Sequence, residues 1–208
     1  MEEKDLTTEA HLRGVLEDEF EFSHQIKDKC FYSGKLKVRR LSGTVDVIDL
    51  IVPVEYIDAD TSYKGRYIEI AGQFRSRNTE DLHLELYILV TQNIVCMGYD
   101  DDNIRFRDDN SIILKGYLCK KGIRKRTSTG KFIYNFILAI NYSKKRTSYL
   151  PCIIWGKEQT SDIMTMMLGT KISAAGRIQS RTYKKTEEGK LVDHITHEIC
   201  LNGFIREE

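Results

Sequence analysis

Residues 169–181 read GTKISAAGRIQSR, and residues 65–77 read GRYIEIAGQFRSR. Aligned at a spacing of 104, the two stretches share six identical positions without a gap. The identical pairs are Gly65 and Gly169, Ile68 and Ile172, Ala71 and Ala175, Gly72 and Gly176, Ser76 and Ser180, and Arg77 and Arg181. A solenoid repeat has about 20–50 residues, whereas about 100 residues is the size of a small domain. The sequence therefore predicts two copies of one domain.

The stretch 169–181 has the pattern of a β-strand. Its small and apolar residues alternate with larger or polar ones, and in a strand they would all point to one side. These core-facing positions are Ile172, Ala174, Gly176 and Ile178. A glycine inside a strand indicates a bend, a bulge or the close approach of another backbone, which tightly coiled barrels need.

The composition is that of a globular protein. The chain has 208 residues, 41% of them hydrophobic and 30% charged, which fits one large or two small domains. It contains no apolar run of about 18 residues, so we expect no membrane-spanning helix, and its polar N-terminus predicts no secretory signal. Five widely spaced cysteines favour reduced thiols in a cytoplasm over a disulfide framework.

The net charge of +1 conceals a strong asymmetry. Residues 1–104 carry 12 Lys and Arg against 21 Asp and Glu, a balance of −9. Residues 105–208 carry 20 against 10, a balance of +10. The second half is therefore the part suited to a polyanion.

The order of predicted elements is similar in the two halves. Capping residues predict a short helix over 7–18. Apolar and aromatic runs then predict strands over 20–26, 29–38, 45–54, 66–77 and 82–95, and again over 111–118, 130–141, 148–156, 170–183 and 194–205. Helical spacing over 157–168 predicts a helix with Ile163, Met167 and Leu168 facing the core.

Five strands with a helix between the third and fourth is the order of an OB-fold. We therefore expect an all-β chain of two tandem five-stranded OB-fold barrels, with the short helix in the second. Periodicity alone leaves an SH3-like barrel or a sandwich open. The expected boundaries are a diverged acidic domain over 1–98, an acidic linker over 99–109 and a basic domain over 110–208.

The second half resembles the bacterial single-stranded DNA-binding protein (SSB) family. The motifs that carry the resemblance are NSIILKGYL (110–118), NFILAIN (135–141), YLPCIIWGK (149–157) and GRIQSRTY (176–183). The first half is a degenerate relative, with Val54 near the place of Trp155. The family usually has one OB domain per chain and assembles four. The resemblance therefore implies a homo-oligomer, here a dimer presenting four OB domains. Residues 203–208 do not contain the family's acidic, apolar tail peptide, so we do not expect partner recruitment through it.

Binding of single strands needs aromatic faces for bases and a cationic groove for phosphates. Tyr149 and Trp155 are six apart, so on a strand they share one face about 20 Å apart. The resemblance implies that these two rings and Tyr183 contact the strand; otherwise Trp155 belongs to the core. Cations cluster in nearby loops, although such runs are often only solvated. The candidate cations are Arg124, Lys125, Arg126, Lys131, Lys144, Lys145, Arg177, Arg181 and Lys184.

The sequence does not support a phosphate-binding loop, a metal site or a catalytic site. The run GIRKRTSTGK has seven residues between Gly122 and Gly130, where a phosphate-binding loop has four. His194 and His197 would point to opposite faces of a strand, so they cannot share a metal. We expect no metal, no cofactor and no enzymatic activity.

The sequence thus predicts a non-specific single-stranded DNA-binding protein that protects exposed strands in replication, recombination or repair. We expect it in the cytoplasm of a bacterium, associated with the nucleoid, or encoded by a phage or mobile element, with replication or repair proteins as partners. We expect residues 105–208 to retain most of the affinity for the strand and residues 1–104 to bind it weakly or not at all. The alternative is a primosomal-type OB adaptor, whose acidic half would dock another protein.

Overall fold

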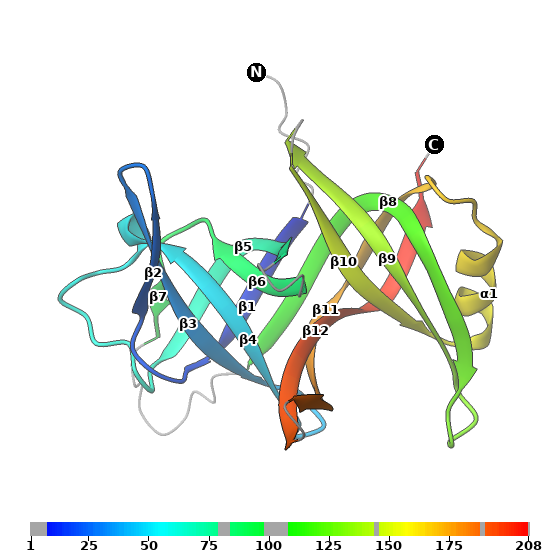
Figure 1. Ribbon diagram of the computed structural model, residues 1–208, viewed down its shortest axis with the longest axis horizontal. Helices are drawn as coiled ribbons and strands as arrows, with labels where there is room; N and C mark the ends of the chain where they lie inside the picture. The colour runs from blue at the N-terminus through cyan, green and yellow to red at the C-terminus, as the bar shows by residue number, and fades with distance from the viewer. Residues whose placement is uncertain (1–7, 79–83, 98–107, 144–145, 188–189, 208) are drawn as a thin grey trace. The chain divides into compact units, whose positions relative to one another are not determined.

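The computed structural model describes residues 8–78, 84–97, 108–143, 146–187 and 190–207. Strands dominate these residues, and α1 (Lys157–Thr165) is their one α-helix, so the all-β prediction is confirmed (Figure 1). That helix is not long and apolar enough to cross a membrane. The contacts between Cα atoms divide the chain into two compact units. The first unit comprises Ala10–Phe74 and Leu86–Ser111, and the second comprises Met1–Glu9, Arg75–Glu85 and Ile112–Glu208.

Among the residues described before position 98, the structure has seven strands and one 3₁₀ turn. They are β1 (Thr8–Leu16), β2 (Glu21–Ile26), β3 (Lys29–Arg39), β4 (Val45–Pro53), the turn Val54–Tyr56, β5 (Tyr67–Asn78), β6 (Leu84–Val90) and β7 (Val95–Cys96). Hydrogen-bonded neighbours follow the order β1, β3, β4, β6, β5, and β5 pairs again with β1. The pairing of β4 with β6 is parallel. The pairings of this unit therefore form a circuit of five strands.

After residue 108, the part of the chain that the structure describes has five strands and α1. They are β8 (Asp109–Arg126), β9 (Phe132–Ser143), β10 (Arg146–Trp155), β11 (Lys171–Glu187) and β12 (Lys190–Arg206), with α1 between β10 and β11. Neighbours follow the order β8, β9, β10, β12, β11, and β11 pairs again with β8. The third and fifth strands, β10 and β12, pair in parallel, as β4 and β6 do. The sequence repeat is thus matched by one pattern of strand pairing.

Each circuit encloses a core to which every one of its strands contributes. In the first unit Leu12, Leu36, Ile48, Ile68 and Ile88 are fully buried, one from each strand. In the second unit Leu118, Leu138, Leu150, Ile172 and Ile199 are the corresponding residues. Full burial of one such side chain contributes about 1.5–3 kcal/mol, so these layers supply much of the stability of each unit.

The repeated glycine permits a close approach of two backbones in both units. A Cβ atom on Gly72 would lie 2.5 Å from the carbonyl oxygen of Leu89, and one on Gly176 would lie 2.4 Å from that of Cys200. The pairing of β11 with β12 also shifts register between Ala175 and Gly176. The sequence interpretation of Gly176 is therefore confirmed, since this position has no room for a side chain.

Two sequence predictions about helices are wrong. Residues 8–16 form strand β1, because Ala10, Leu12 and Leu16 alternate with more exposed residues at a period of two. Helix α1 ends at Thr165, and beyond it Met167 and Leu168 are largely exposed. Of the three apolar residues expected to face the core, only Ile163 does so.

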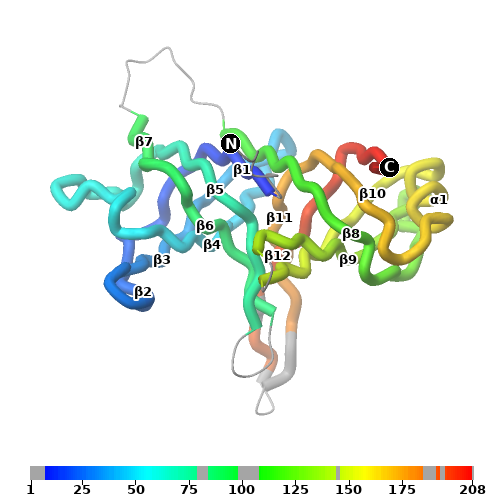
Figure 2. Tube along the Cα trace, turned by 90° about the horizontal axis from the view of Figure 1, so that it is seen from above, coloured from blue at the N-terminus to red at the C-terminus, as the bar shows by residue number. Residues whose placement is uncertain are grey.

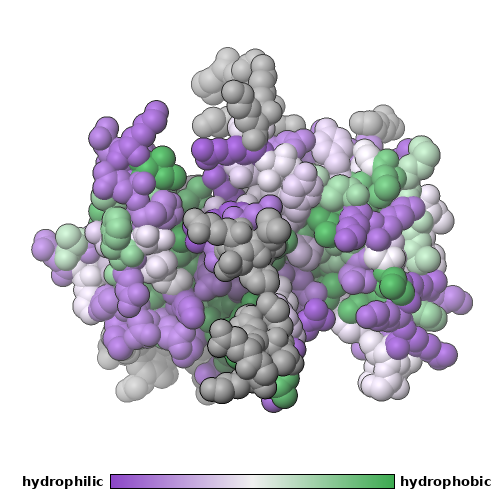
Figure 3. Space-filling view, viewed as in Figure 1, coloured by the Kyte–Doolittle hydropathy of each residue, from purple (hydrophilic) through white to green (hydrophobic). Residues whose placement is uncertain are grey.

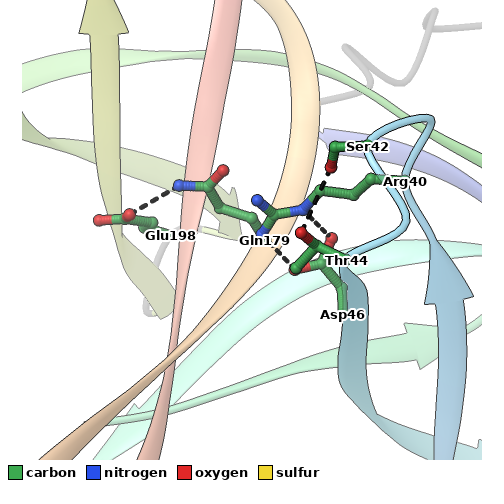
Figure 4. A network of polar contacts seen from close by, with 6 residues as sticks. All are labelled: Arg40, Ser42, Thr44, Asp46, Gln179 and Glu198. Carbon is green, nitrogen blue, oxygen red and sulfur yellow. Dashed lines mark hydrogen bonds and ion pairs between the residues drawn. The ribbon is translucent and has the colours of Figure 1, made fainter. Parts of the chain in front are cut away.

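Polar contacts fix two turns of the first unit. At the β3–β4 turn, the Arg40 Nε and Nη2 atoms donate to the two carboxylate oxygens of Asp46, over 2.7 and 2.6 Å (Figure 4). Further along, the Glu19 carboxylate accepts hydrogen bonds from the Ser62 hydroxyl and from the backbone amides of Tyr63 and Lys64. These donors hold the pKa of Glu19 below its ordinary value, the Ser62 hydroxyl having the largest effect.

Candidate nucleic-acid interface

Strands β8, β9 and β10 lie side by side and present one face outward from the core of the second unit (Figure 1). On β10, Tyr149 is 49% exposed and Trp155 is 39% exposed, whereas Leu150, Cys152 and Ile154 between them are buried. The two rings therefore share the outward face, as their spacing predicts. Trp155 is neither a core residue nor fully solvated, so part of its side chain is accessible.

A third ring, which the sequence analysis did not propose as a site residue, lies in the same row as Tyr149. Ala139 of β9 pairs with Tyr149 on one side and with Tyr117 of β8 on the other. Residues directly opposite in antiparallel strands point to the same face, so Tyr117, which is 40% exposed, faces outward with Tyr149. The alternation of buried Ile112, Leu114, Gly116 and Leu118 was the signal that could have identified it.

The row that contains Trp155 also contains a cation. Ile133 of β9 pairs with Trp155 and with Lys125 of β8, and Lys125 is exposed. A positive charge therefore lies two strands away from the indole on the same face. This combination suits an unstacked base with a phosphate beside it.

Two of the predicted cations make contacts that support the β8–β9 hairpin. The Arg124 guanidinium lies 4.0 Å from the centre of the Phe132 ring, and its Nη2 atom donates to the carbonyl oxygen of Lys157 over 3.2 Å. The Arg126 Nε atom donates to the carbonyl oxygen of Gly130 over 3.3 Å. Arg124 thus ties the hairpin to the start of α1. Lys131 is exposed at the hairpin turn.

A second set of predicted residues lies on β11, which runs out with β12 as a long hairpin (Figure 2). Arg177, Arg181 and Tyr183 are at alternate positions and share one strand face, while Lys184 points to the other. Tyr183, Arg181 and Lys184 are exposed. The predicted Lys144 and Lys145 lie outside the described residues.

Strand pairing connects this set to β10. Arg177 pairs with Cys200 of β12, which pairs in turn with Ile153 of β10. The Arg177 Nε atom is buried and has no hydrogen-bond partner among the residues that the structure describes.

The thiols near this face are structural. Burial raises the pKa of Cys119 and of Cys152, so both remain protonated at neutral pH. The Cys119 thiol donates to the carbonyl oxygen of Ile137, with 3.3 Å between sulfur and oxygen. All five cysteines are free, as the sequence predicts. Within the described ranges no group of three His, Cys, Asp or Glu residues could hold a metal ion.

The space-filling view shows the mixed character of this region. Over β8, β9 and β10, at the right of Figure 3, hydrophobic and hydrophilic side chains lie next to one another. A surface of this kind offers apolar contacts and charges together, which stacked bases and phosphates both require.

Comparisons with known proteins place relatives beside the second half of the chain. The model of the Single-strand binding protein family matches residues 109–205. A Single-stranded DNA-binding protein of Enterococcus faecalis is 28% identical over 99 residues, which are 45% of this chain and 52% of the relative. Single-stranded DNA-binding protein B of Bacillus subtilis is 31% identical over 84 residues, which are 38% of this chain and 74% of the relative. The chain spans about half the length of the Enterococcus relative.

A solved structure matches both halves of the chain. The wild-type single-stranded DNA binding protein from Thermus aquaticus has a TM-score of 0.74 over 97% of this chain and 93% of its own. The two sequences are 15% identical, so the likeness is one of fold.

Proposed function

We propose, because this chain belongs to the single-strand binding protein family, that it binds single-stranded DNA without sequence preference. The observation that carries the proposal is the outward face of β8, β9 and β10, with Tyr149, Trp155 and Lys125 exposed on it. Bases stack on the two rings and phosphates meet the cation. The protein would thereby cover exposed strands during replication, recombination or repair and prevent their reannealing.

The path of the strand follows the two sets of side chains. From the β10 face it continues along β11, where Arg177, Arg181 and Tyr183 offer two cations and a ring on one strand face. Lys131 and Lys184, both on described strands or turns, add positive charge around this path. Arg124 and Arg126 act by holding the β8–β9 hairpin in place. Binding of this kind sequesters the strand and needs no catalytic group, so the protein is not an enzyme.

The same proposal includes the architecture. Each circuit of five strands is an OB-fold barrel, the domains extend over 1–98 and 110–208, and 99–109 link them. Two chains form a dimer that presents four such barrels. The protein works beside replication and repair proteins in a bacterial cytoplasm, in keeping with its bacterial relatives and free thiols.

A length series of oligo-dT tests the function. We expect full-length protein to bind oligomers above a minimum length, with far weaker binding to a duplex of equal length. Light scattering on the same samples reports whether two chains are present. Failure to bind oligo-dT at low salt would contradict the proposal and favour the adaptor alternative.

A substitution tests the face itself. Replacing Trp155 by Ala should weaken oligo-dT binding by about 1–3 kcal/mol, the usual value of one stacked base. Trp155→Phe is the matched control, because it keeps an aromatic face and should retain most of the affinity. Equal affinities of wild type, Trp155→Ala and Trp155→Phe for oligo-dT would show that the strand does not contact Trp155.

A further inference from the structure

One edge of β10 is only partly covered by its neighbouring strands. Along one edge β10 pairs with β9 from Arg146 to Trp155. Along the other, its parallel pairing with β12 covers Cys152, Ile153 and Ile154. The backbone around Tyr149 therefore lies outside the pairing with β12, and an amide there needs another acceptor.

A segment from the first half of the sequence supplies that acceptor. Residues 75–78 at the end of β5 belong to the second unit. The Tyr149 amide donates to the Ser76 hydroxyl, with 2.8 Å between nitrogen and oxygen. The Ser76 amide in turn donates to the Ser148 hydroxyl over 2.9 Å. Both serines are buried, so these reciprocal bonds close the edge away from water.

Aromatic and ionic contacts hold the same segment. The Arg75 guanidinium lies 4.2 Å from the centre of the Tyr142 ring on β9, a cation–π contact. The Arg77 Nε atom pairs with the Glu85 carboxylate over 2.6 Å, which joins β5 to β6 within the segment. Ser76 is therefore held from both sides while it contacts Tyr149.

We propose that Ser76 is a positioning residue for the strand-binding face: it caps the open edge of β10 and fixes the backbone from which the Tyr149 ring projects. The proposal rests on the proposed function, because Tyr149 is taken as a stacking platform. The hydrogen bond from the Tyr149 amide is partly buried, and an amide in such a place is left poorly satisfied when it loses its acceptor. Without the Ser76 hydroxyl this part of β10 would therefore open more often. The ring would then lose its fixed orientation toward a base.

The test compares four full-length proteins: wild type, Ser76→Ala, Ser76→Thr and Asn78→Ala. Hydrogen exchange at the Tyr149 amide is measured without DNA, and oligo-dT affinity is measured in parallel. We expect Ser76→Ala to speed exchange at that amide about five- to tenfold and to lower affinity by a similar factor. Ser76→Thr keeps the hydroxyl, and Asn78→Ala changes an exposed residue of the same strand end, so neither should alter either quantity.

The two readouts separate the possible failures. Unchanged exchange at Tyr149 in Ser76→Ala would overturn the cap, whether or not DNA binds. Faster exchange with unchanged affinity would overturn the positioning role while leaving the proposed function intact. If wild type binds no oligo-dT, the proposed function fails, and the positioning role fails with it.

A second variant covers the case in which Ser76→Ala does not fold. Ser148→Ala removes the acceptor of the Ser76 amide and leaves the bond to Tyr149 in place. We expect faster exchange at the Ser76 amide in this variant, and unchanged exchange there would contradict the capping contact.

Discussion

At the scale of single residues, neighbouring cations of the β8–β9 hairpin have different surroundings. Lys125 is exposed in the row of Trp155, whereas Arg124 packs over Phe132 and donates to the carbonyl oxygen of Lys157. From the sequence alone, both residues belong to one run of basic residues and are predicted to contact phosphates. Only the folded hairpin separates the residue available to a phosphate from the one that supports the hairpin.

The two substitutions should therefore affect different measurements. Lys125→Ala should reduce the steepness of the salt dependence of oligo-dT binding by about 0.7, the loss of one phosphate contact, without changing the melting temperature. Arg124→Ala should lower stability by about 1–2 kcal/mol, because it removes the ring contact and the hydrogen bond. Titrations at several salt concentrations, with thermal melts, check both. A lowered melting temperature in Lys125→Ala would contradict this assignment.

Glu19 gives a prediction about pH. Its folded-state pKa is lowered, first by the Ser62 hydroxyl and then by two backbone amides. A carboxylate with a lowered folded pKa stabilises the fold above its unfolded pKa of about 4.3, and this stabilisation is lost as the pH falls through the folded value. Glu19→Gln should therefore lower the melting temperature at pH 7, and the difference from wild type should shrink below about pH 4. Glu21→Gln changes an exposed residue of β2 and is the control. If the lower melting temperature of Glu19→Gln persists in acid, the charge of the Glu19 carboxylate is excluded as its cause.

At the scale of elements, the repeated glycine can be tested against a nearby one on the next strand. A Cβ atom added to Gly176 would lie 2.4 Å from the carbonyl oxygen of Cys200. A Cβ atom added to Gly203 would meet nothing within 4 Å. Gly176→Ala should cost about 1–3 kcal/mol of folding stability through overpacking. Gly203→Ala should be neutral or stabilise by about 0.4–1 kcal/mol, because it restricts the unfolded chain. Thermal melts of the two variants that agree within error would show that the close approach does not constrain residue 176.

Most of the strands were predictable from the sequence, but strand β1 was not, because residues 7–18 were expected to form a helix. Burial alternates with a period of two along the first part of β11, and the sequence shows this directly in Ile172, Ala174 and Ile178. Residues 8–16 have the same alternation, but Thr7, Thr8 and Glu9 also fit a helix start, and this local signal is misleading. Pairing with β3 and β5 decides the outcome, and such partners cannot be recognised within a nine-residue window.

At the scale of the whole molecule, the charge balance of −9 against +10 predicts which half meets the strand. The rows of the candidate face follow from strand spacing, which is why Tyr149 and Trp155 could be placed together from the sequence. Ser76 could not be placed in this way. Its contact with Tyr149 joins residues 73 positions apart and depends on which strand edge remains uncovered. A fragment of residues 105–208 would lack Ser76, so the full chain is the appropriate protein for binding experiments.

The most direct test of strand binding at the β8–β10 face uses the single tryptophan of the chain. Trp155 is the only indole, so its fluorescence reports on that face alone. Titration of the full-length protein with oligo-dT should quench this fluorescence as a base stacks on the ring, in a saturable manner that weakens steeply with added salt. Oligo-dT binding seen by an independent method with unchanged Trp155 fluorescence would contradict the account.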